Sequence, residues 1–163
     1  MIYEVEGDIM MTRAAVIAQG VAVNDPMTSG LARKLQEKFP MMREEYLAWC
    51  EETNPEPGAI WLWGGADQLR VVNLVTQEGG DPELKRQGRP TKIAIHRALR
   101  ALNKLVLEER LPSIAMPKLG GGFGGVDWLE VRGMMHSQLG NLLIPLFVYV
   151  TELDGMLASE PGM

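Results

Sequence analysis

Cysteine is nearly absent from this chain of 163 residues, which contains a single one, Cys50. One cysteine excludes an internal disulfide and a cysteine-based zinc site, so we expect a reducing, cytoplasmic setting. Long apolar runs are also missing, because no stretch approaches the roughly 20 residues that span a bilayer. The first residues, MIYEVEGDIM, alternate and carry an early acid, unlike a signal peptide. We therefore expect no membrane partner.

Basic residues are too few to give the chain a net positive charge. Its 16 Lys and Arg residues face 21 Asp and Glu residues, for a formal net charge of −5. General nucleic-acid binding relies on clustered basic residues and is not expected. An acidic protein can still bind an anionic ligand through backbone N–H groups. His96 and His136 have no partner at a metal-binding spacing, so no metal site or cofactor is predicted.

The overall amino-acid composition is typical of a folded protein. It is 46% hydrophobic and 23% charged, without repeats or low-complexity tracts. We predict one domain over residues 1–151, followed by a frayed tail over residues 152–163.

Hydrophobic periodicity and breakers predict alternating strands and helices. Strands are expected over residues 2–6, 14–18, 59–63, 69–75, 113–116 and 142–150. Helices are expected around Leu31 to Phe39, over residues 40–52 and 91–109, and from about Asp127. Thr28 or Ser29 can cap the first of these helices and Thr91 the third, in which Ile95, Leu99, Leu102 and Val106 form an apolar stripe. A polar loop is expected from Gln19 to Ser29 and a longer one from Thr76 to Pro90. This order indicates an α/β protein, a three-layer α/β/α sandwich with a mixed central sheet.

The segment KLGGGFGGVDW, residues 118–128, holds five glycines within six residues, interrupted only by Phe123. Glycine permits positive φ and close approach of the backbone to a ligand. Lying between a strand and a helix N-terminus, such a loop can bind phosphate oxygens through its N–H groups. The alternative is a turn without a ligand. The pattern matches neither a P-loop nor a Rossmann glycine motif.

A second loop, Met27 to Leu31, also opens a helix and contains a glycine. Two opposed helix starts suit a diphosphate better than a single phosphate. Asp8 follows the first strand, where its carboxylate can accept a hydrogen bond from an adenine amino group. The alternative interpretation of Asp8 is a turn or cap residue.

Three segments together resemble the macro domain family. They are GDI near the N-terminus, the small-residue loop leading into GLARKLQEKFP, and AMPKLGGGFGGVDW. The resemblance covers residues 3–150 and points to the branch with terminal ADP-ribose protein glycohydrolase and the DNA ADP-ribosyl glycohydrolase antitoxins. It implies a macro-type sandwich whose ligand is ADP-ribose, free or attached to a macromolecule.

The resemblance also implies roles for individual residues. Asp8 would bind adenine, Ile9 would pack near the base, and Gln19 would lie near the distal ribose. The complete set of expected ligand contacts is Asp8, Ile9, Gln19, Gly20, Met27, Thr28, Ser29, Gly30, Leu31, Thr76, Leu119, Gly120, Gly121, Gly122, Phe123 and Gly124.

Two departures from the family pattern concern catalysis. Gln77 stands where glycohydrolases of this branch carry a lysine, and Gly124 stands where the human enzyme has an aspartate. A glutamine cannot form a Schiff base with an opened ribose. One hypothesis is a hydrolase in which Ser29 and Gln77 orient a water that attacks the distal ribose. Its substrate would be ADP-ribosylated protein or nucleic acid, or phosphorylated ADP-ribose. The alternative is a non-catalytic reader or scavenger of ADP-ribose or a related nucleotide.

Overall fold

A mixed sheet forms the centre of the protein. The computed structural model describes residues 1–65, 69–80, 88–121 and 125–163. The strands lie in the order β1-β6-β5-β2-β4-β3. Their bounds are β1 (Ile2–Gly7), β2 (Val16–Ala22), β3 (Ile60–Gly64), β4 (Arg70–Gln77), β5 (Ile114–Pro117) and β6 (Leu146–Glu152). β3 pairs antiparallel with β4, and the other described pairings are parallel. The carboxyl ends of the five parallel strands therefore meet at one edge.

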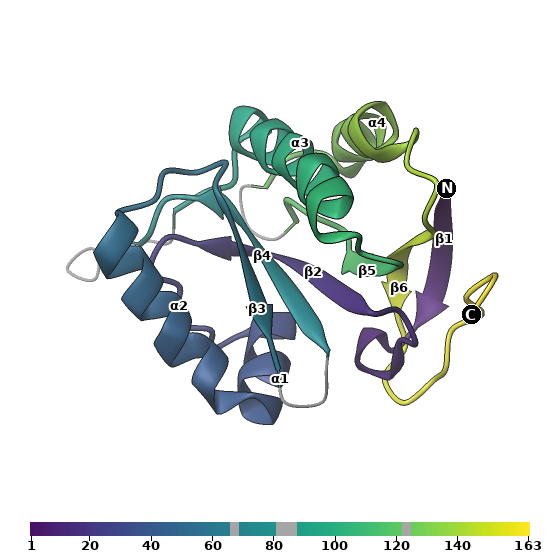
Figure 1. The fold of residues 1–163 in the computed structure, drawn as a ribbon, viewed down its shortest axis with the longest axis horizontal. Coiled ribbons are helices and arrows are strands. Elements are labelled where there is room, and N and C mark those ends of the chain that lie inside the picture. The colour runs from purple at the N-terminus through teal and green to yellow at the C-terminus, as the bar shows by residue number, and fades with distance from the viewer. Residues whose placement is uncertain (66–68, 81–87, 122–124) are drawn as a thin grey trace.

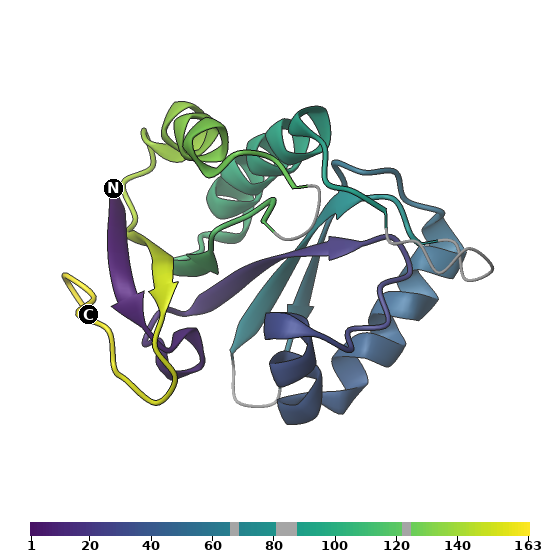
Figure 2. The same ribbon diagram turned by 180° about the vertical axis from the view of Figure 1, so that it is seen from behind.

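Helices cover both faces of the sheet, as Figures 1 and 2 show. They are η1 (Ile9–Met11, a short 3-10 helix), α1 (Gly30–Lys38), α2 (Pro40–Thr53), α3 (Lys92–Glu109) and α4 (Trp128–Leu139). One core cluster joins α1 and α2 to the sheet, and a second joins α3 and α4 to the opposite face. The predicted element order and the three-layer α/β/α sandwich are confirmed. None of the described helices is long and apolar enough to cross a membrane.

The predicted apolar stripe of α3 forms part of the core. Ile95, Leu99, Leu102 and Val106 are all buried. The Thr91 side chain accepts a hydrogen bond from Ala94 N at 3.1 Å and caps the helix as expected. Periodicity and capping therefore identify this element from local sequence alone.

Two tryptophans of β3 pack against the α1–α2 layer. The Trp61 ring lies 5.6 Å from that of Tyr46, and the Trp63 ring lies 5.3 Å from that of Phe39, measured between centroids. The Tyr46 hydroxyl donates to Ala22 O at 2.7 Å. Helix α2 is thereby attached to the end of β2, where the loop that leads to α1 begins.

The expected start of that loop, at Gln19, is wrong. Strand β2 continues to Ala22 because it is a central strand, with Gln19 beside Asn73 and Val21 beside Val75 in β4. The loop proper begins at Val23. Pairing with a neighbouring strand outweighs the weak local strand signal of residues 19–22.

The end of the chain also differs from expectation. Strand β6 begins at Leu146, because residues 140–145 form turns that end at Pro145. The tail is not frayed, since Ala158 and Glu160 are buried, with 3% and 4% of their surfaces exposed. Residues 153–163, hereafter the C-terminal segment, return along η1 and the end of β1 (Figure 1).

Candidate functional site

A cavity of about 510 Å³ lies at the carboxyl ends of β2, β4 and β5. This is the edge at which α/β proteins bind ligands, and the volume lies within the usual range of about 300–1,000 Å³. The sequence-predicted residues that line it are Gln19, Gly20, Thr28, Ser29, Gly30, Leu31, Thr76, Gln77, Leu119, Gly120 and Gly121. The structure thus brings most of the two predicted loops to one cavity.

The first turn of α1 forms one wall. The hydrogen bond from Arg33 N to Ser29 O, at 3.2 Å, lies at the start of the helix. The N–H groups of residues 30–32 come before that bond and have no acceptor within the helix. The same three residues line the cavity. Ser29 is the N-cap residue, as expected, but its hydroxyl makes no capping hydrogen bond to this described helix. Gly30 has a φ of +58°, and a Cβ at this position would meet nothing within 4 Å, so the wall is open.

Asp25 holds the loop before α1 in shape. Its carboxylate accepts hydrogen bonds from Ala22 N at 2.9 Å and from Met27 N at 2.8 Å. Met27 has a φ of +55° and a buried side chain that belongs to the α1–α2 core. Met27 therefore anchors the loop, while Thr28 and Ser29 remain exposed at the cavity.

Residues 117–121, which lead into the glycine loop, form the facing wall. Val126 N donates to Gly120 O at 2.8 Å, and a Cβ on Gly125 would lie 2.0 Å from the same oxygen. The two ends of the loop are thus pinched together at a point that admits only glycine. Gly121 has open space around it. Three predicted contacts, Gly122, Phe123 and Gly124, lie outside the described residues.

The floor of the cavity is polar and deeply buried. Gln19 is 1% exposed, and its Nε2 donates to Asn73 Oδ1 at 2.8 Å. Gln19 Oε1 and Asn73 Nδ2 are buried without a hydrogen-bond partner in the described protein. Buried polar atoms are normally paired, so this floor has unused hydrogen-bonding capacity. Gly20 is the exposed residue of β2, and because it has no side chain it leaves space in the cavity.

Gln77, the predicted water-orienting residue, also lines the cavity. Its Nε2 donates to Gly88 O at 2.6 Å, which fixes the side-chain amide. Thr76 is 3% exposed, and the side chain of Leu119 belongs to the α3–α4 core. Thr76 and Leu119 therefore shape the floor mainly by packing.

Asp8 and Ile9 lie apart from this cavity, at the end of β1. Ile9 is 2% exposed and packs in the core. Asp8 Oδ1 accepts from Met10 N at 2.9 Å, so Asp8 is the N-cap of η1. The cap interpretation of Asp8 is confirmed. Its predicted role in binding adenine stays a prediction.

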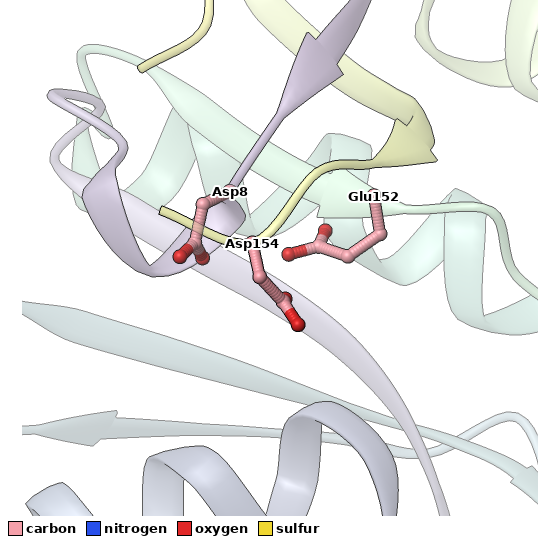
Figure 3. A group of neighbouring side chains, drawn as sticks. All are labelled: Asp8, Glu152 and Asp154. Carbon is pink, nitrogen blue, oxygen red and sulfur yellow. The ribbon is translucent and has the colours of Figure 1, made fainter. Parts of the chain in front are cut away.

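Three carboxylates gather beside η1, as Figure 3 shows for Asp8, Glu152 and Asp154. One oxygen from each lies within 4.8 Å of the others. The Lys34 ammonium compensates this charge, at 3.2 Å from Asp154 and 4.0 Å from Glu152. Lys34 belongs to α1, whose first turn lines the cavity, so this helix joins the cavity to the carboxylates.

The carboxylates differ in how readily they ionise. The hydrogen bond from Gly155 N holds the pKa of Asp8 below its usual value, against the opposing effect of burial. Burial, followed by the neighbouring charge of Asp8, raises the pKa of Glu152. The Asp154 carboxylate raises the pKa of Lys34. Asp8 therefore stays ionised at neutral pH and can accept hydrogen bonds.

Several residues of the site were not predicted from the sequence. Asp25, Pro26, Ala32, Pro117 and Lys118 also line the cavity. The Asn-Asp-Pro sequence is a turn signal that identifies Asp25 as a loop-bracing residue. Asn73 had no such signal, because only the pairing of β2 with β4 places it beside Gln19.

The fold is that of an α/β protein, and its cavity, lined by the start of α1 and by Gly120 and Gly121, has a shape and lining suited to an anionic ligand. The sequence pattern of the Macro domain family matches residues 22–135. The chain therefore belongs to the macro domain family.

Relatives of known activity share about a quarter of the sequence. A DNA ADP-ribosyl glycohydrolase of Thermus aquaticus is 27% identical over 143 residues, covering 85% of this chain and 38% of that protein. One from Mycobacterium tuberculosis is 26% identical over 160 residues, covering 96% of this chain and 41% of that protein. The chain thus spans about two fifths of the length of these relatives.

Solved structures show the same fold. The macrodomain of Thermus aquaticus DarG has a TM-score of 0.80 and 25% identity, covering 92% of this chain and 98% of that one. Thermosipho africanus DarTG in complex with ADP-ribose has a TM-score of 0.77 and 23% identity, covering 91% of this chain and 41% of that one.

Proposed function

We propose that this macro domain binds ADP-ribose and removes it from a modified macromolecule. The observation that carries the proposal is the pair of facing walls, with the first turn of α1 on one side and Gly120–Gly121 on the other. Both walls offer backbone N–H groups to a diphosphate without requiring positive side chains. This explains how a chain with a net charge of −5 binds an anion.

The residues around the diphosphate site suggest where the ribose end and the adenine end of ADP-ribose would lie. The distal ribose would lie over Gln19 and Gly20, where the unpartnered Gln19 Oε1 can accept from a ribose hydroxyl. The adenine would lie beside η1, near Lys34 in the middle of α1, where Asp8 can accept from its amino group. These positions agree with those that the family resemblance implies.

DNA is the first substrate to test, because the relatives of known activity act on ADP-ribosylated DNA. The predicted lack of general nucleic-acid binding does not conflict with this choice. A protein that binds the ADP-ribose group needs no basic stripe to hold the DNA attached to it.

Turnover would proceed by attack of a water oxygen on the anomeric carbon while the bond to the modified group breaks. A water proton would pass to the departing group. The amide of Gln77 and the hydroxyl of Ser29 are not bases at neutral pH, so they would orient the water rather than deprotonate it. Rate acceleration would therefore come from positioning and from stabilising the oxocarbenium-like transition state.

The second candidate function is that of a non-catalytic reader or scavenger. Gln77 favours it, because its amide nitrogen is already bonded to Gly88 O and it lacks the nucleophilic amine of a lysine. In that case the same cavity would bind ADP-ribose without hydrolysing its attachment.

Calorimetric titration with ADP-ribose, followed by incubation with an ADP-ribosylated DNA oligonucleotide, tests both candidates. ADP-ribosylated protein and phosphorylated ADP-ribose serve as parallel substrates. Binding together with release of ADP-ribose supports the hydrolase. Binding without turnover of any substrate supports the reader, and no binding at millimolar ADP-ribose contradicts both.

A further inference from the structure

The C-terminal segment holds Asp8 in place through its backbone. Asp8 N donates to Met156 O at 2.7 Å, and Gly155 N donates to Asp8 Oδ2 at 2.9 Å. The third bond, from Met10 N to Oδ1, comes from η1 itself. Both carboxylate oxygens are thus engaged, so the orientation of the Asp8 carboxylate depends on residues 155 and 156.

Glu160 anchors this segment. Its side chain is buried, and its carboxylate accepts three hydrogen bonds. The donors are Thr12 Oγ1 at 2.5 Å, Arg13 N at 2.8 Å and the Tyr149 hydroxyl at 2.9 Å. All three donors are neutral groups, and buried carboxylates are costly unless such bonds satisfy them. Glu160 is therefore held in one defined position.

The anchor lies next to the site that it would organise. Thr12 and Arg13 directly follow η1, the helix that Asp8 caps, and Tyr149 belongs to β6. Glu160 consequently ties the segment to the end of η1 opposite Asp8. Figures 1 and 2 show the segment passing η1 and the end of β1 on its way to the C-terminus.

Between Gly155 and Glu160 the segment packs closely on β1. Ala158 is buried, and a Cβ on Gly7 would lie 2.8 Å from the Ala158 Cβ. Leu153 N also donates to Gly7 O at 3.0 Å. Contacts of this kind leave little freedom for Gly155 to shift relative to Asp8 while Glu160 is bound.

We propose that Glu160 is a positioning residue for base recognition: by fixing the C-terminal segment, it orients the Asp8 carboxylate toward the amino group of adenine. This inference rests on the proposed binding of ADP-ribose. It adds a residue that contacts no ligand and that sets how strongly the protein prefers adenine to another base.

The test compares ADP-ribose with IDP-ribose in the full chain. Hypoxanthine carries a carbonyl oxygen where adenine has its amino group, so an oriented Asp8 carboxylate repels it. Glu160→Ala removes all three hydrogen bonds of the anchor. We expect it to weaken ADP-ribose binding by about tenfold, the effect of one hydrogen bond to a charged group. IDP-ribose binding should change much less, so the preference for adenine falls.

Matched variants separate positioning from general stability. Ser159→Ala changes an exposed neighbour, and Glu44→Ala removes an exposed glutamate of α2, so both should keep the wild-type preference. Tyr149→Phe removes one of the three hydrogen bonds to Glu160 and replaces Glu160→Ala as the test if that variant does not fold. We expect it to lower the preference for ADP-ribose over IDP-ribose by a smaller factor than Glu160→Ala. In an Asp8→Ala background, Glu160→Ala should leave the preference unchanged.

An unchanged preference for ADP-ribose over IDP-ribose in the folded anchor variants overturns the inference. Equal weakening of both nucleotides also overturns it, because that result indicates only a loosened fold. Failure of the wild-type protein to bind either nucleotide would instead show that the proposed function is wrong.

Discussion

Gln19 and Asn73 share one hydrogen bond across β2 and β4, and each leaves its other amide atom buried without a partner in the described protein. The donor-acceptor distance is 2.8 Å. Such unsatisfied atoms cost stability and are few in native proteins. Gln19 also lines the cavity, so a ligand hydroxyl that donates to Gln19 Oε1 would offset part of this loss of stability.

The double variant Gln19→Met/Asn73→Leu tests this relationship. Because both partners become apolar, we expect unfolding stability in urea to stay the same or rise. ADP-ribose affinity should fall about tenfold, since the acceptor for the ribose is gone. Single Asn73→Leu should instead destabilise by about 1–3 kcal/mol, because it leaves Gln19 wholly unsatisfied. Unchanged ADP-ribose affinity in the double variant would show that this pair does not face the ligand.

Tyr46→Phe should destabilise the fold without disturbing the ring packing of α2 on β3. The variant loses the 2.7 Å bond to Ala22 O, and that carbonyl keeps its hydrogen bond from Asp25 N at 3.1 Å. We expect a cost of about 1 kcal/mol and a decrease in Tm of about 2–4 °C. Tyr3→Phe is the control, because among the described residues its hydroxyl makes only a 3.5 Å contact with Met1 Sδ at the exposed surface. Equal Tm values for the two variants would contradict the assignment.

Glu152→Gln should stabilise the protein at neutral pH. The pKa of Glu152 is raised in the folded protein by burial and by Asp8, so ionisation of this carboxyl weakens the fold as pH rises through that pKa. The side chain is 42% exposed and pairs with Lys34, so the gain should not exceed about 0.5 kcal/mol. It should vanish below pH 4.5, the usual pKa, where both states are protonated.

Thermal unfolding from pH 3.5 to 8 measures this effect. Glu109→Gln, at an exposed position at the end of α3, serves as the control. A stabilisation by Glu152→Gln that is equal at pH 3.5 and pH 7 would argue against the ionisation of Glu152 as its cause.

Gln77→Ala separates orientation of the water from ligand binding. If Gln77 orients the attacking water, release of ADP-ribose from DNA should slow by at least tenfold, while the Kd for ADP-ribose changes less than threefold. Single-turnover release and calorimetry provide the two numbers. An unchanged release rate excludes this role for Gln77.

Local sequence signals predicted much of this architecture. The stripe of α3 and its Thr91 cap needed no tertiary information, and the glycine loop was placed correctly between β5 and α4. Both depend on patterns within a few residues. The bracing role of Asp25 had a signal as well, in the turn sequence Asn-Asp-Pro.

Relationships between distant residues could not be predicted in the same way. Gln19 and Asn73 are 54 residues apart, and Glu160 is 148 residues from Thr12. The strand order places Gln19 beside Asn73, and the return of the C-terminal segment past η1 places Glu160 beside Thr12. The tail was misjudged for this reason, because its small residues give no periodic signal and its order comes from hydrogen bonds to η1 and β6.

Gly121→Glu tests whether the diphosphate of ADP-ribose binds between the start of α1 and the glycine loop. A Cβ at Gly121 meets nothing within 4 Å, so the fold should tolerate the side chain, while its carboxylate repels a diphosphate. Gly133→Glu is the matched control, because Gly133 has equally open surroundings on α4 and lies outside the cavity lining. In calorimetric titrations, we expect Gly121→Glu to weaken ADP-ribose binding by at least a hundredfold, while Gly133→Glu binds like the wild type. Equal, undiminished affinity in both variants would contradict it.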